Sequence, residues 1–505
     1  MARWHPPETP TRMQPTQKPD SISTGIEGLD EILGGGFTPH RLYLLEGEPG
    51  SGKTTMGLQF LLDGVRNGET VLYVTLSETR QELIETAASH GWSLEGIHVH
   101  ELLPMGNQLD PESQYTMFHP SEVELGETTS RMLQEVERLQ PTRVVFDSLA
   151  EIRLLAGTML RFRRQVLALK QYFAGRGSTV LLLDDAHGID QGAPVHTIVH
   201  GAVVLDQMRP DYGGDRRRLH VTKLRGRPFI GGYHDYVIRT GGVMVFPRLV
   251  ASDFRRDGNN VPVGSNLPEL DALLGGGLDR GTSILLMGAA GVGKSSLAAH
   301  FVMAAADRGE RSAMFLFDES ERTLLTRTHG MGLQLQARID DDMVEVRSID
   351  PAELSPGEFI QSIRHEVEQK QARLVVIDSL SGYLNAMAGE KYVMIQLHEL
   401  LAYLGQMGVV TLLINAQKGL IGQMATDIDV SYLADTVILL RYFEAHGEVR
   451  QAMSVLKKRT GPHERSIREL TLTSSGIKVG EPLRQFSGVL TGVPRVNPRG
   501  LDGKP

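Results

Sequence analysis

The sequence predicts an α/β protein with two tandem domains, each built on a doubly wound, mostly parallel sheet flanked by helices. A motif of the form G-x-x-x-x-G-K-[ST] occurs twice, at 47–54 and at 288–295. Its two lysines, Lys53 and Lys294, are 241 positions apart, and the same spacing separates the Leu-Asp segments that precede the motifs. The chain of 505 residues is also long for a single hydrophobic core. We therefore expect a duplicated unit.

The composition is that of an ordinary globular protein, with 41% hydrophobic and 22% charged residues. The 52 basic and 61 acidic residues give a formal charge of −9, which provides no general attraction to nucleic acid. The absence of cysteine excludes disulfides, thiolate zinc sites and cysteine nucleophiles. The polar start of the chain does not resemble a signal peptide, and no apolar run approaches the roughly 18 residues that span a bilayer. We expect a cytoplasmic protein with no membrane segment.

Shifts in composition along the chain indicate its domain boundaries. The start is polar and rich in proline, and the junction around 248–262 has the charged, glycine and asparagine residues of a linker. The end of the chain is again rich in proline and glycine. The predicted organisation is a flexible arm at 1–18, a first domain at 19–247, a linker at 248–262, a second domain at 263–485 and a tail at 486–505.

Short apolar runs alternate with helix-compatible stretches in the same order in both domains, which indicates buried parallel strands joined by helices. The predicted strands lie at 41–45, 71–76, 143–147 and 179–183, and then at 283–287, 313–317, 373–378 and 409–414. A helix is predicted after each glycine motif, at 55–67 and at 296–308. Sheets of this kind bind their ligands at the carboxyl ends of the strands.

Each glycine motif follows an apolar strand and opens a helix, which is the setting of a phosphate-binding loop. Glycines let backbone N–H groups wrap phosphates at a helix N-terminus, and the motif lysine reaches the β- and γ-phosphates. An ordinary glycine-rich turn could explain one such motif, but two in the same setting argue against it. The predicted ATP-binding residues are Gly47, Glu48, Pro49, Gly50, Ser51, Gly52, Lys53, Thr54 and Thr55, and Gly288, Ala289, Ala290, Gly291, Val292, Gly293, Lys294, Ser295 and Ser296.

A carboxylate at the end of a later strand completes each predicted nucleotide site. The runs at 143–147 and 373–378 both end in an aspartate, Asp147 or Asp378. Such a carboxylate holds the hydration shell of Mg²⁺ opposite the hydroxyl of the phosphate loop, here Thr54 or Ser295. An apolar run that ends in aspartate is common by itself, but its order after a phosphate loop and its duplication favour a Mg²⁺ site. We add Glu319 to these candidate metal ligands.

Carboxylates also follow the second strand of each domain. The first domain has Glu78 after Ser77, whereas the second has the adjacent pair Asp318 and Glu319. We predict that these carboxylates position and activate water for attack on the phosphoryl group. The alternative is that Ser77 and Glu78, with their counterparts, only cap the helix that follows.

Each domain closes with a basic pair, Lys223 and Arg225 in the first and Lys457 and Arg459 in the second. These residues are far along the chain from their own phosphate loop. They could face the nucleotide of a neighbouring subunit, where an arginine stabilises charge on the transferring phosphoryl group. A solvated basic turn is the alternative.

Taken together, these motifs closely resemble those of the KaiC family, the duplicated RecA-type ATPases of the cyanobacterial clock and their bacterial and archaeal relatives. The resemblance spans roughly residues 20–495 and includes both phosphate loops, the two Asp-Ser strand ends, both Lys-x-Arg segments, and the segments 33–36, 75–79, 317–320, 435–440 and 486–492. It implies two RecA-like domains, a double-ring homohexamer with ATP between protomers, and autokinase activity in the second ring. KaiB-like or histidine-kinase partners are implied by the resemblance alone.

In the family, the second ring phosphorylates a serine and the adjacent threonine across the subunit interface. The serine position is occupied by Ser431, and Tyr432 stands where the threonine would be, while Thr426 matches another threonine of that segment. The phenolic oxygen of a tyrosine lies several ångströms farther from the backbone than a threonine hydroxyl. We therefore expect Ser431 as a single phosphoacceptor, with Thr426 as a second candidate, and no two-site cycle.

The family usually has two glutamates where this chain has Ser77 and Glu78, or Asp318 and Glu319. The lone Glu78 leads us to expect weaker or altered hydrolysis in the first ring. Two other functions remain open. A DNA-handling motor would share the fold, but the net charge of −9 and the lack of a zinc ribbon or a basic–aromatic stretch argue against nucleic acid. A nucleotide-gated scaffold with little turnover would explain Ser77 and Tyr432.

Overall fold

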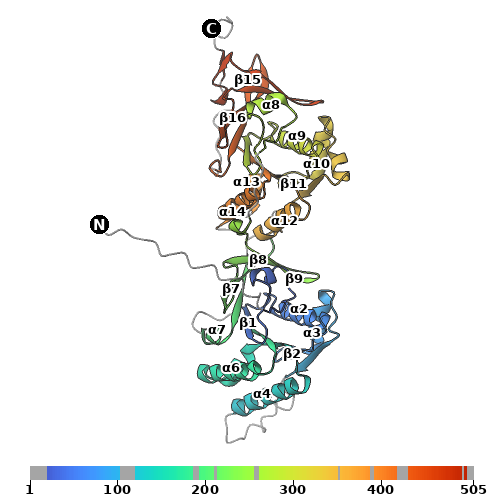
Figure 1. Cartoon of the computed structure of the whole chain (residues 1–505), viewed down its shortest axis with the longest axis vertical. Coiled ribbons are helices and arrows are strands. Elements are labelled where there is room, and N and C mark those ends of the chain that lie inside the picture. Colours follow the sequence, from blue (N-terminus) through green and yellow to red (C-terminus); the bar gives the residue numbers. More distant parts are fainter. Residues whose placement is uncertain are drawn as a thin grey trace, which may run out of the picture. The chain divides into compact units, whose positions relative to one another are not determined.

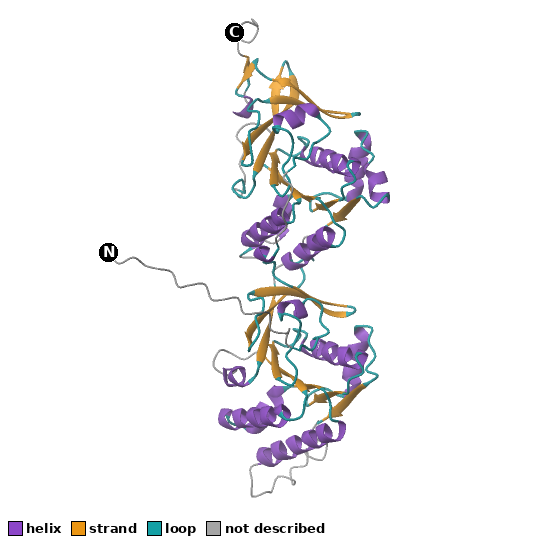
Figure 2. Ribbon diagram, in the orientation of Figure 1, coloured by secondary structure: helices purple, strands orange, loops and turns teal. Residues whose placement is uncertain are grey.

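The computed structural model forms two compact units, and the boundary between them falls between Arg248 and Leu249 (Figure 1). It describes residues 20–102, 120–185, 193–209, 213–254, 261–350, 353–386, 392–417, 430–491 and 494–496. No helix in these ranges is long and apolar enough to cross a membrane. Each unit has a single large sheet with helices packed against it (Figure 2).

The first unit contains a nine-stranded sheet in the order β3-β2-β4-β5-β1-β6-β7-β8-β9. Its strands are β1 (Leu42–Gly47), β2 (Val71–Thr75), β3 (Ile97–Glu101), β4 (Arg143–Asp147), β5 (Thr179–Asp185), β6 (Gly201–Met208), β7 (Arg216–Leu224), β8 (Tyr233–Arg239) and β9 (Gly242–Phe246). Its helices are α1 (Leu29–Ile32), α2 (Lys53–Arg66), α3 (Arg80–Ser89), α4 (Pro120–Leu139), α5 (Leu149–Ala156), α6 (Met159–Ala174) and α7 (Ala193–Ile198).

The second unit repeats this sheet in the order β12-β11-β13-β14-β10-β15-β16-β17-β18. The strands of this sheet are β10 (Ser283–Gly288), β11 (Ser312–Leu316), β12 (Val344–Ser348), β13 (Leu374–Asp378), β14 (Val410–Ala416), β15 (Thr436–Ala445), β16 (Glu448–Lys458), β17 (Arg468–Thr473) and β18 (Gly476–Pro482). Two short strands, β19 (Phe486–Ser487) and β20 (Arg495–Val496), pair separately. Its helices are η3 (Ala251–Asp253), α8 (Pro268–Leu273), α9 (Lys294–Asp307), α10 (Glu321–Gly330), α11 (Leu335–Asp340), α12 (Pro356–Glu368), α13 (Leu380–Ala386), α14 (Val393–Gln406) and η4 (Val489–Thr491).

The six strands from β3 to β6 run parallel, and helices cover both faces of this part of the sheet. On β1, Leu42 and Leu44 join the core beneath α4, α5 and α6, while Tyr43 and Leu45 join the core beneath α2 and α3. Parallel strands covered on both faces need apolar residues at every position, which is why the sequence shows continuous apolar runs here. The predicted α/β class and mostly parallel sheet are confirmed.

The last strands of each sheet form an antiparallel extension that the apolar runs did not reveal. In the first unit β6 pairs antiparallel with β7, and the pairing changes register between Ala202 and Val203. In the second unit β15 and β16 show the same change between Val437 and Ile438. Each change is a β-bulge, in which one strand carries an extra residue and its following side chains are re-aimed.

Part of the segment predicted as a linker is packed against the second unit. Leu249 and Ala251 are buried beside α14, whose Glu399 carboxylate accepts a hydrogen bond from the Ala251 N–H at 3.3 Å. Residues 255–260 of that segment, like the whole predicted arm at 1–18 and part of the tail, lie outside the described residues.

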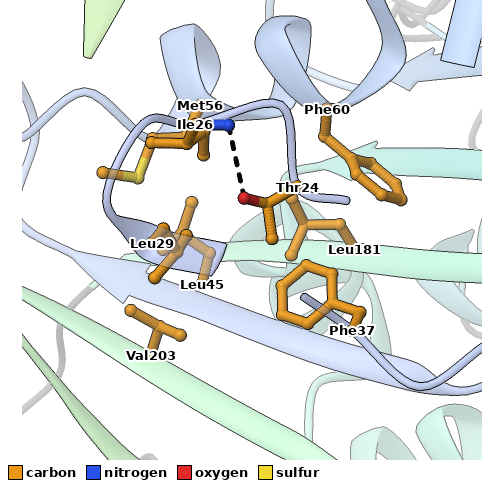
Figure 3. Close-up of a pocket in the computed structure, with 9 residues that line it drawn as sticks. All are labelled: Thr24, Ile26, Leu29, Phe37, Leu45, Met56, Phe60, Leu181 and Val203. Atoms are coloured by element: carbon orange, nitrogen blue, oxygen red, sulfur yellow. Dashed lines mark hydrogen bonds between the residues drawn. The ribbon is translucent and has the colours of Figure 1, made fainter. Parts of the chain in front are cut away.

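A small cavity lies in the first unit between the segment 24–37, α2 and the sheet (Figure 3). Its lining is apolar except for Thr24, whose hydroxyl donates to Asp30 at 2.7 Å and accepts the N–H of Ile26 at 3.3 Å. A lining with one hydroxyl that is already bonded offers little to a polar ligand, so we regard this cavity as packing space.

Candidate functional site

The two glycine motifs form tight loops between a strand and a helix, as predicted. Gly50 and Gly52 have φ angles of 81° and 96°, and Gly291 and Gly293 have φ angles of 75° and 104°. These left-handed values favour glycine, and a Cβ on Gly52 would also lie 2.7 Å from the Ile238 side chain. The helices begin at Lys53 and Lys294, two residues earlier than predicted, because the last glycine of each motif is already the N-cap.

The two motif lysines are buried, and their ammonium groups bond to their own loops. Lys53 Nζ donates to the carbonyl oxygens of Gly47 and Glu48 at 2.7 and 3.1 Å, and it forms an ion pair with Asp185 at 3.0 Å. Lys294 Nζ donates to the carbonyls of Gly288 and Ala289 at 2.9 and 2.7 Å. Within the described part of the second unit Lys294 has no ion-pair partner, and burial lowers its pKa to about 8.

The strand-end aspartates lie beside the hydroxyls that the sequence paired with them. Thr54 Oγ1 donates to Asp147 Oδ2 at 3.0 Å, and the buried Tyr73 hydroxyl donates to the same oxygen at 2.6 Å. Asp378 Oδ2 is buried without a hydrogen-bond partner in the described residues, and burial raises the pKa of Asp378 to about 6 although the nearby Ser295 hydroxyl lowers it. Each aspartate precedes a serine through a cis peptide bond. Hydroxyl and carboxylate oxygens, one of them without a partner, fit a hard cation such as Mg²⁺.

Glu78 is not the cap of the helix that follows it. Thr79 caps α3 in a capping box with Glu82, and Ser320 caps α10 in the second unit, so the capping alternative is wrong for the carboxylates. The backbone of Glu78 is fixed by the buried Thr75, whose hydroxyl donates to the Glu78 carbonyl at 2.6 Å. Glu78 Oε2 is buried without a hydrogen-bond partner among the described residues, and burial and the charge of Asp147 raise the pKa of Glu78.

The corresponding carboxylates of the second unit are both engaged. Asp318 accepts a hydrogen bond from the Ser379 hydroxyl. Glu319 is held by a bidentate ion pair in which two nitrogens of the Arg327 guanidinium each lie 2.7 Å from a carboxylate oxygen. Arg327 also lies within electrostatic reach of Asp378. The structure therefore brings Glu319 and Asp378 to one site with a cation that the sequence did not single out.

The basic pairs bind backbone carbonyls near the amino ends of β6 and β15, at the edge of the sheet opposite the phosphate loops. Lys223 Nζ donates to the carbonyls of His196 and Val199 at 2.6 and 2.8 Å, and Arg225 donates to that of Thr197 at 2.9 Å. In the second unit Lys457 Nζ donates to the carbonyls of Ser431 and Ala434 at 2.9 and 2.7 Å. Arg459 donates to the Tyr432 carbonyl at 3.0 Å.

These pairs are distant from the phosphate loop of their own unit. Lys223 lies opposite Ala202, which pairs with Leu44 of β1, three residues before Gly47 begins the loop. Lys457 lies opposite Val437, which pairs with Leu285, three residues before Gly288. A strand rises about 3.3 Å per residue, so about 10 Å separate each pair from its own loop along the strand alone. Their predicted role toward a neighbouring nucleotide stays a prediction.

Ser431 and Tyr432 lie on the turn that Lys457 and Arg459 hold, and Thr426 lies outside the described residues. Ser431 is half-buried, whereas the Tyr432 side chain is exposed. The turn sits at the start of β10, where the Ser283 hydroxyl donates to the Leu433 carbonyl at 3.2 Å.

Sequence reasoning missed Asp185, Tyr73 and Arg327. Asp185 reaches Lys53 because β5 pairs with β1, and Asp147 meets Tyr73 because β4 pairs with β2. Both contacts depend on long-range pairing that no local pattern shows. Arg327 follows Glu319 by eight residues, about two helical turns, so helix periodicity was the one available signal.

The KaiC ATPase family matches the chain over residues 22–250 and 263–484, which include both phosphate loops and both strand-end aspartates. The chain belongs to the KaiC family. Similar proteins include the "Circadian clock oscillator protein KaiC" of Parasynechococcus marenigrum, which is 28% identical over 97% of this chain and 95% of its own length. The protein of the same name from Synechococcus elongatus is 28% identical over 94% of this chain and 91% of its own length.

A third relative, the "Circadian clock protein KaiC3" of Synechocystis, is 26% identical over 95% of this chain and 96% of its own length. KaiC membership and the two repeated sheets confirm the predicted pair of RecA-like domains. A KaiC-family ATPase binds and hydrolyses ATP, which agrees with the two loop geometries described above.

Proposed function

We propose that this KaiC-family ATPase is a Mg²⁺-dependent homohexamer in which the first site hydrolyses ATP and the second phosphorylates Ser431 of a neighbouring copy. Thr426 is a second candidate acceptor. The proposal rests most on one observation: both units keep a complete phosphate loop beside a strand-end aspartate, while their other carboxylates are engaged differently. Phosphorylation of Ser431 would add about −1.5 to −2 charges to a turn held by cations, and so change how partner proteins dock.

At the first site, Glu78 is the residue placed to accept a proton from water. Hydrolysis joins the water oxygen to the γ-phosphorus and breaks the bond from that phosphorus to the bridging oxygen, whose electron pair leaves with ADP. Mg²⁺ held by Thr54 and Asp147 would neutralise charge on the phosphate oxygens. A carboxylate with a raised pKa and a buried oxygen that has no partner in the part of the chain that the structure describes is suited to general base catalysis. This geometry favours the reverse of our expectation that the first ring hydrolyses ATP more weakly.

At the second site, geometry favours transfer between copies of the chain. The turn with Ser431 lies at the start of β10, whereas the phosphate loop begins at Gly288, five residues later. At about 3.3 Å per residue these positions are about 16 Å apart, too far for Ser431 to reach the γ-phosphate of its own unit. The Ser431 oxygen would instead attack the γ-phosphorus of ATP bound to a neighbour. The bond from that phosphorus to the bridging oxygen breaks, its electron pair leaves with ADP, and Asp318 of that neighbour accepts the serine proton.

Incubation with γ-labelled ATP and Mg²⁺, followed by mass mapping of the phosphosite, tests the proposal. We expect label on Ser431 and its loss in Ser431→Ala. Mixing Lys294→Ala chains with Ser431→Ala chains should restore label, because each supplies what the other lacks. Absence of label from the wild type, or unchanged label in Ser431→Ala, would rule out the Ser431 assignment. Sizing in the presence of ATP tests the hexamer separately.

A further inference from the structure

The Arg327–Glu319 ion pair is the largest difference between the two sites in how a catalytic carboxylate is held. Both carboxylate oxygens of Glu319 face N–H donors of one guanidinium, each at 2.7 Å. The pair is shielded, with 16% of the Glu319 side chain and 33% of the Arg327 side chain exposed. A bidentate fork fixes both the position and the plane of a carboxylate more firmly than a single hydrogen bond does.

Among the described residues, Glu319 is the one hydrogen-bonded partner of the Arg327 guanidinium, although the charge of Asp378 also attracts it. Its Nε is buried without a hydrogen-bond partner, so Glu319 is the group that holds the guanidinium in the site. The counterpart of Glu319 is Glu78, and the residue eight positions after Glu78 is Thr86, which has no charge. The difference therefore arises from one position on matching helices, α3 and α10.

We propose that Arg327 is a positioning residue that excludes water as the phosphoryl acceptor at the second site, so that bound ATP is kept for transfer to Ser431. The two hydrogen bonds from Arg327 hold the Glu319 carboxylate along α10. The positive charge of the guanidinium also makes this carboxylate a weaker acceptor for a water proton. Hydrolysis would need Glu319 to turn toward water and give up at least one charge-assisted bond. Transfer to Ser431 does not need Glu319, because Asp318 takes the proton. The inference rests on the function proposed above.

The test measures how the γ-phosphate of labelled ATP divides between free phosphate and protein. It uses the full-length chain with Glu78→Gln, which silences hydrolysis at the first site. We expect Arg327→Thr, the residue of the first unit, to raise phosphate release about tenfold or more and to lower label on Ser431. Arg327→Lys should be intermediate, since a lysine keeps the charge but cannot form the fork. Adding Glu319→Gln to Arg327→Thr should return phosphate release to the starting value.

Other outcomes would overturn the inference. An equal fall in free phosphate and protein label would mean that Arg327 only supports the fold. Unchanged phosphate release, or none in either protein, would mean that Glu319 is not restrained by Arg327. Weaker binding of a fluorescent ATP analogue to Arg327→Thr would assign Arg327 to phosphate binding instead. A wild type without label on Ser431, but with increased phosphate release in Arg327→Thr, would reject the proposed kinase function and keep this inference.

The first unit supplies the reciprocal experiment. Thr86→Arg, with Glu78 intact, places an arginine at the same distance along α3. We expect it to lower hydrolysis at the first site by about tenfold. Thr86→Leu is the matched control, because it changes the size of the same side chain without adding charge. Equal effects of the two substitutions would contradict the inference.

Discussion

In the first unit one carboxylate oxygen of Glu78, Oε2, is buried without a partner among the described residues, and the motif lysine is paired with Asp185. In the second unit these relations are exchanged, since Glu319 is paired with Arg327 while Lys294 contacts only carbonyls there. The phosphate loops and the sheet orders are the same. The two copies thus share the backbone of the loop and differ in the charges around it, which would let one fold support the two uses of ATP proposed above.

The largest expected effect, and the clearest test of the difference between the two sites, is the loss of ATP hydrolysis when the Glu78 charge is removed. We expect Glu78→Gln to lower ATP hydrolysis by the first site about 10²- to 10⁴-fold, because the amide cannot accept the water proton. Steady-state phosphate release measures the effect. Glu85→Gln on the exposed face of α3 is the control and should have no effect. If Glu319→Gln lowers the rate as much as Glu78→Gln, the two sites do not differ in the way described.

A second difference lies in the cores, where a fully buried arginine of the first unit corresponds to a leucine of the second. Arg143 is 1% exposed and pairs with Asp63 and Glu69 at 3.0 and 2.8 Å, whereas Leu374 occupies the matching start of β13. Arg143→Leu leaves two carboxylates without their cation, so we expect a loss of about 3–5 kcal/mol in the stability of the first unit. Denaturant unfolding followed by the fluorescence of Trp92 reports on this unit, because the second has no tryptophan.

The control for this substitution is Arg66→Leu, at the exposed end of α2, with an expected change within about 0.5 kcal/mol. Adding Asp63→Asn and Glu69→Gln to Arg143→Leu should recover part of the loss, since the stranded charges are then removed. A loss no larger than that of Arg66→Leu would show that Arg143 is dispensable.

We expect a lower pH to reduce the unfolding free energy of the first unit through protonation of His234. Its Nδ1 accepts the Arg248 N–H at 2.8 Å and its Nε2 donates to the Ile230 carbonyl at 2.9 Å, and burial lowers its pKa from 6.5 to about 4. The folded protein favours neutral His234. The stabilisation that this residue contributes to folding is therefore complete above pH 6.5, and it is lost as the pH falls toward 4. The shift corresponds to about 3 kcal/mol.

The measurement is the unfolding free energy from Trp92 fluorescence between pH 7 and pH 4.5. We expect the advantage of the wild type over His234→Gln, which keeps one donor and one acceptor, to shrink over this range. A constant difference would show that His234 is not the group that titrates. Arg468 holds the matching position opposite Met453 in the second unit.

The smallest expected effect concerns Asp185. In our prediction Lys53 must leave this partner to bind the phosphates. The matching position in the second unit is Ala416. Because 42% of the Asp185 side chain is exposed, the pair contributes at most about 1 kcal/mol. We expect Asp185→Ala to tighten ATP binding to the first site about two- to fivefold.

A titration with a fluorescent ATP analogue, with the second site disabled by Lys294→Ala, measures this affinity. Asp215→Ala, on an exposed ion pair with Arg217, is the control. Unchanged or weaker binding in Asp185→Ala would show that the ion pair does not compete with nucleotide.

Local patterns were enough to predict the phosphate loops, the strand-end aspartates and the parallel strands, because each depends on residues that are close in sequence. The cap of α3 was misjudged by two residues, since Ser77 and Thr79 have equivalent side-chain chemistry and only the backbone decides between them. The contacts of Lys53 with Asp185 and of Asp147 with Tyr73 depend on which strands are neighbours, and the strand order is a property of the whole sheet. The ion pair of Glu319 depends on the side-chain conformation of Arg327 on α10, which no sequence motif specifies.

The register change beside Lys223 recurs beside Lys457, at the same place in both sheets. An extra residue in a strand moves every later side chain to the opposite face, so its loss would turn each basic pair away from the carbonyls that it binds. The same bulge thus directs a lysine to carbonyls of α7 in one copy and to the turn with Ser431 in the other.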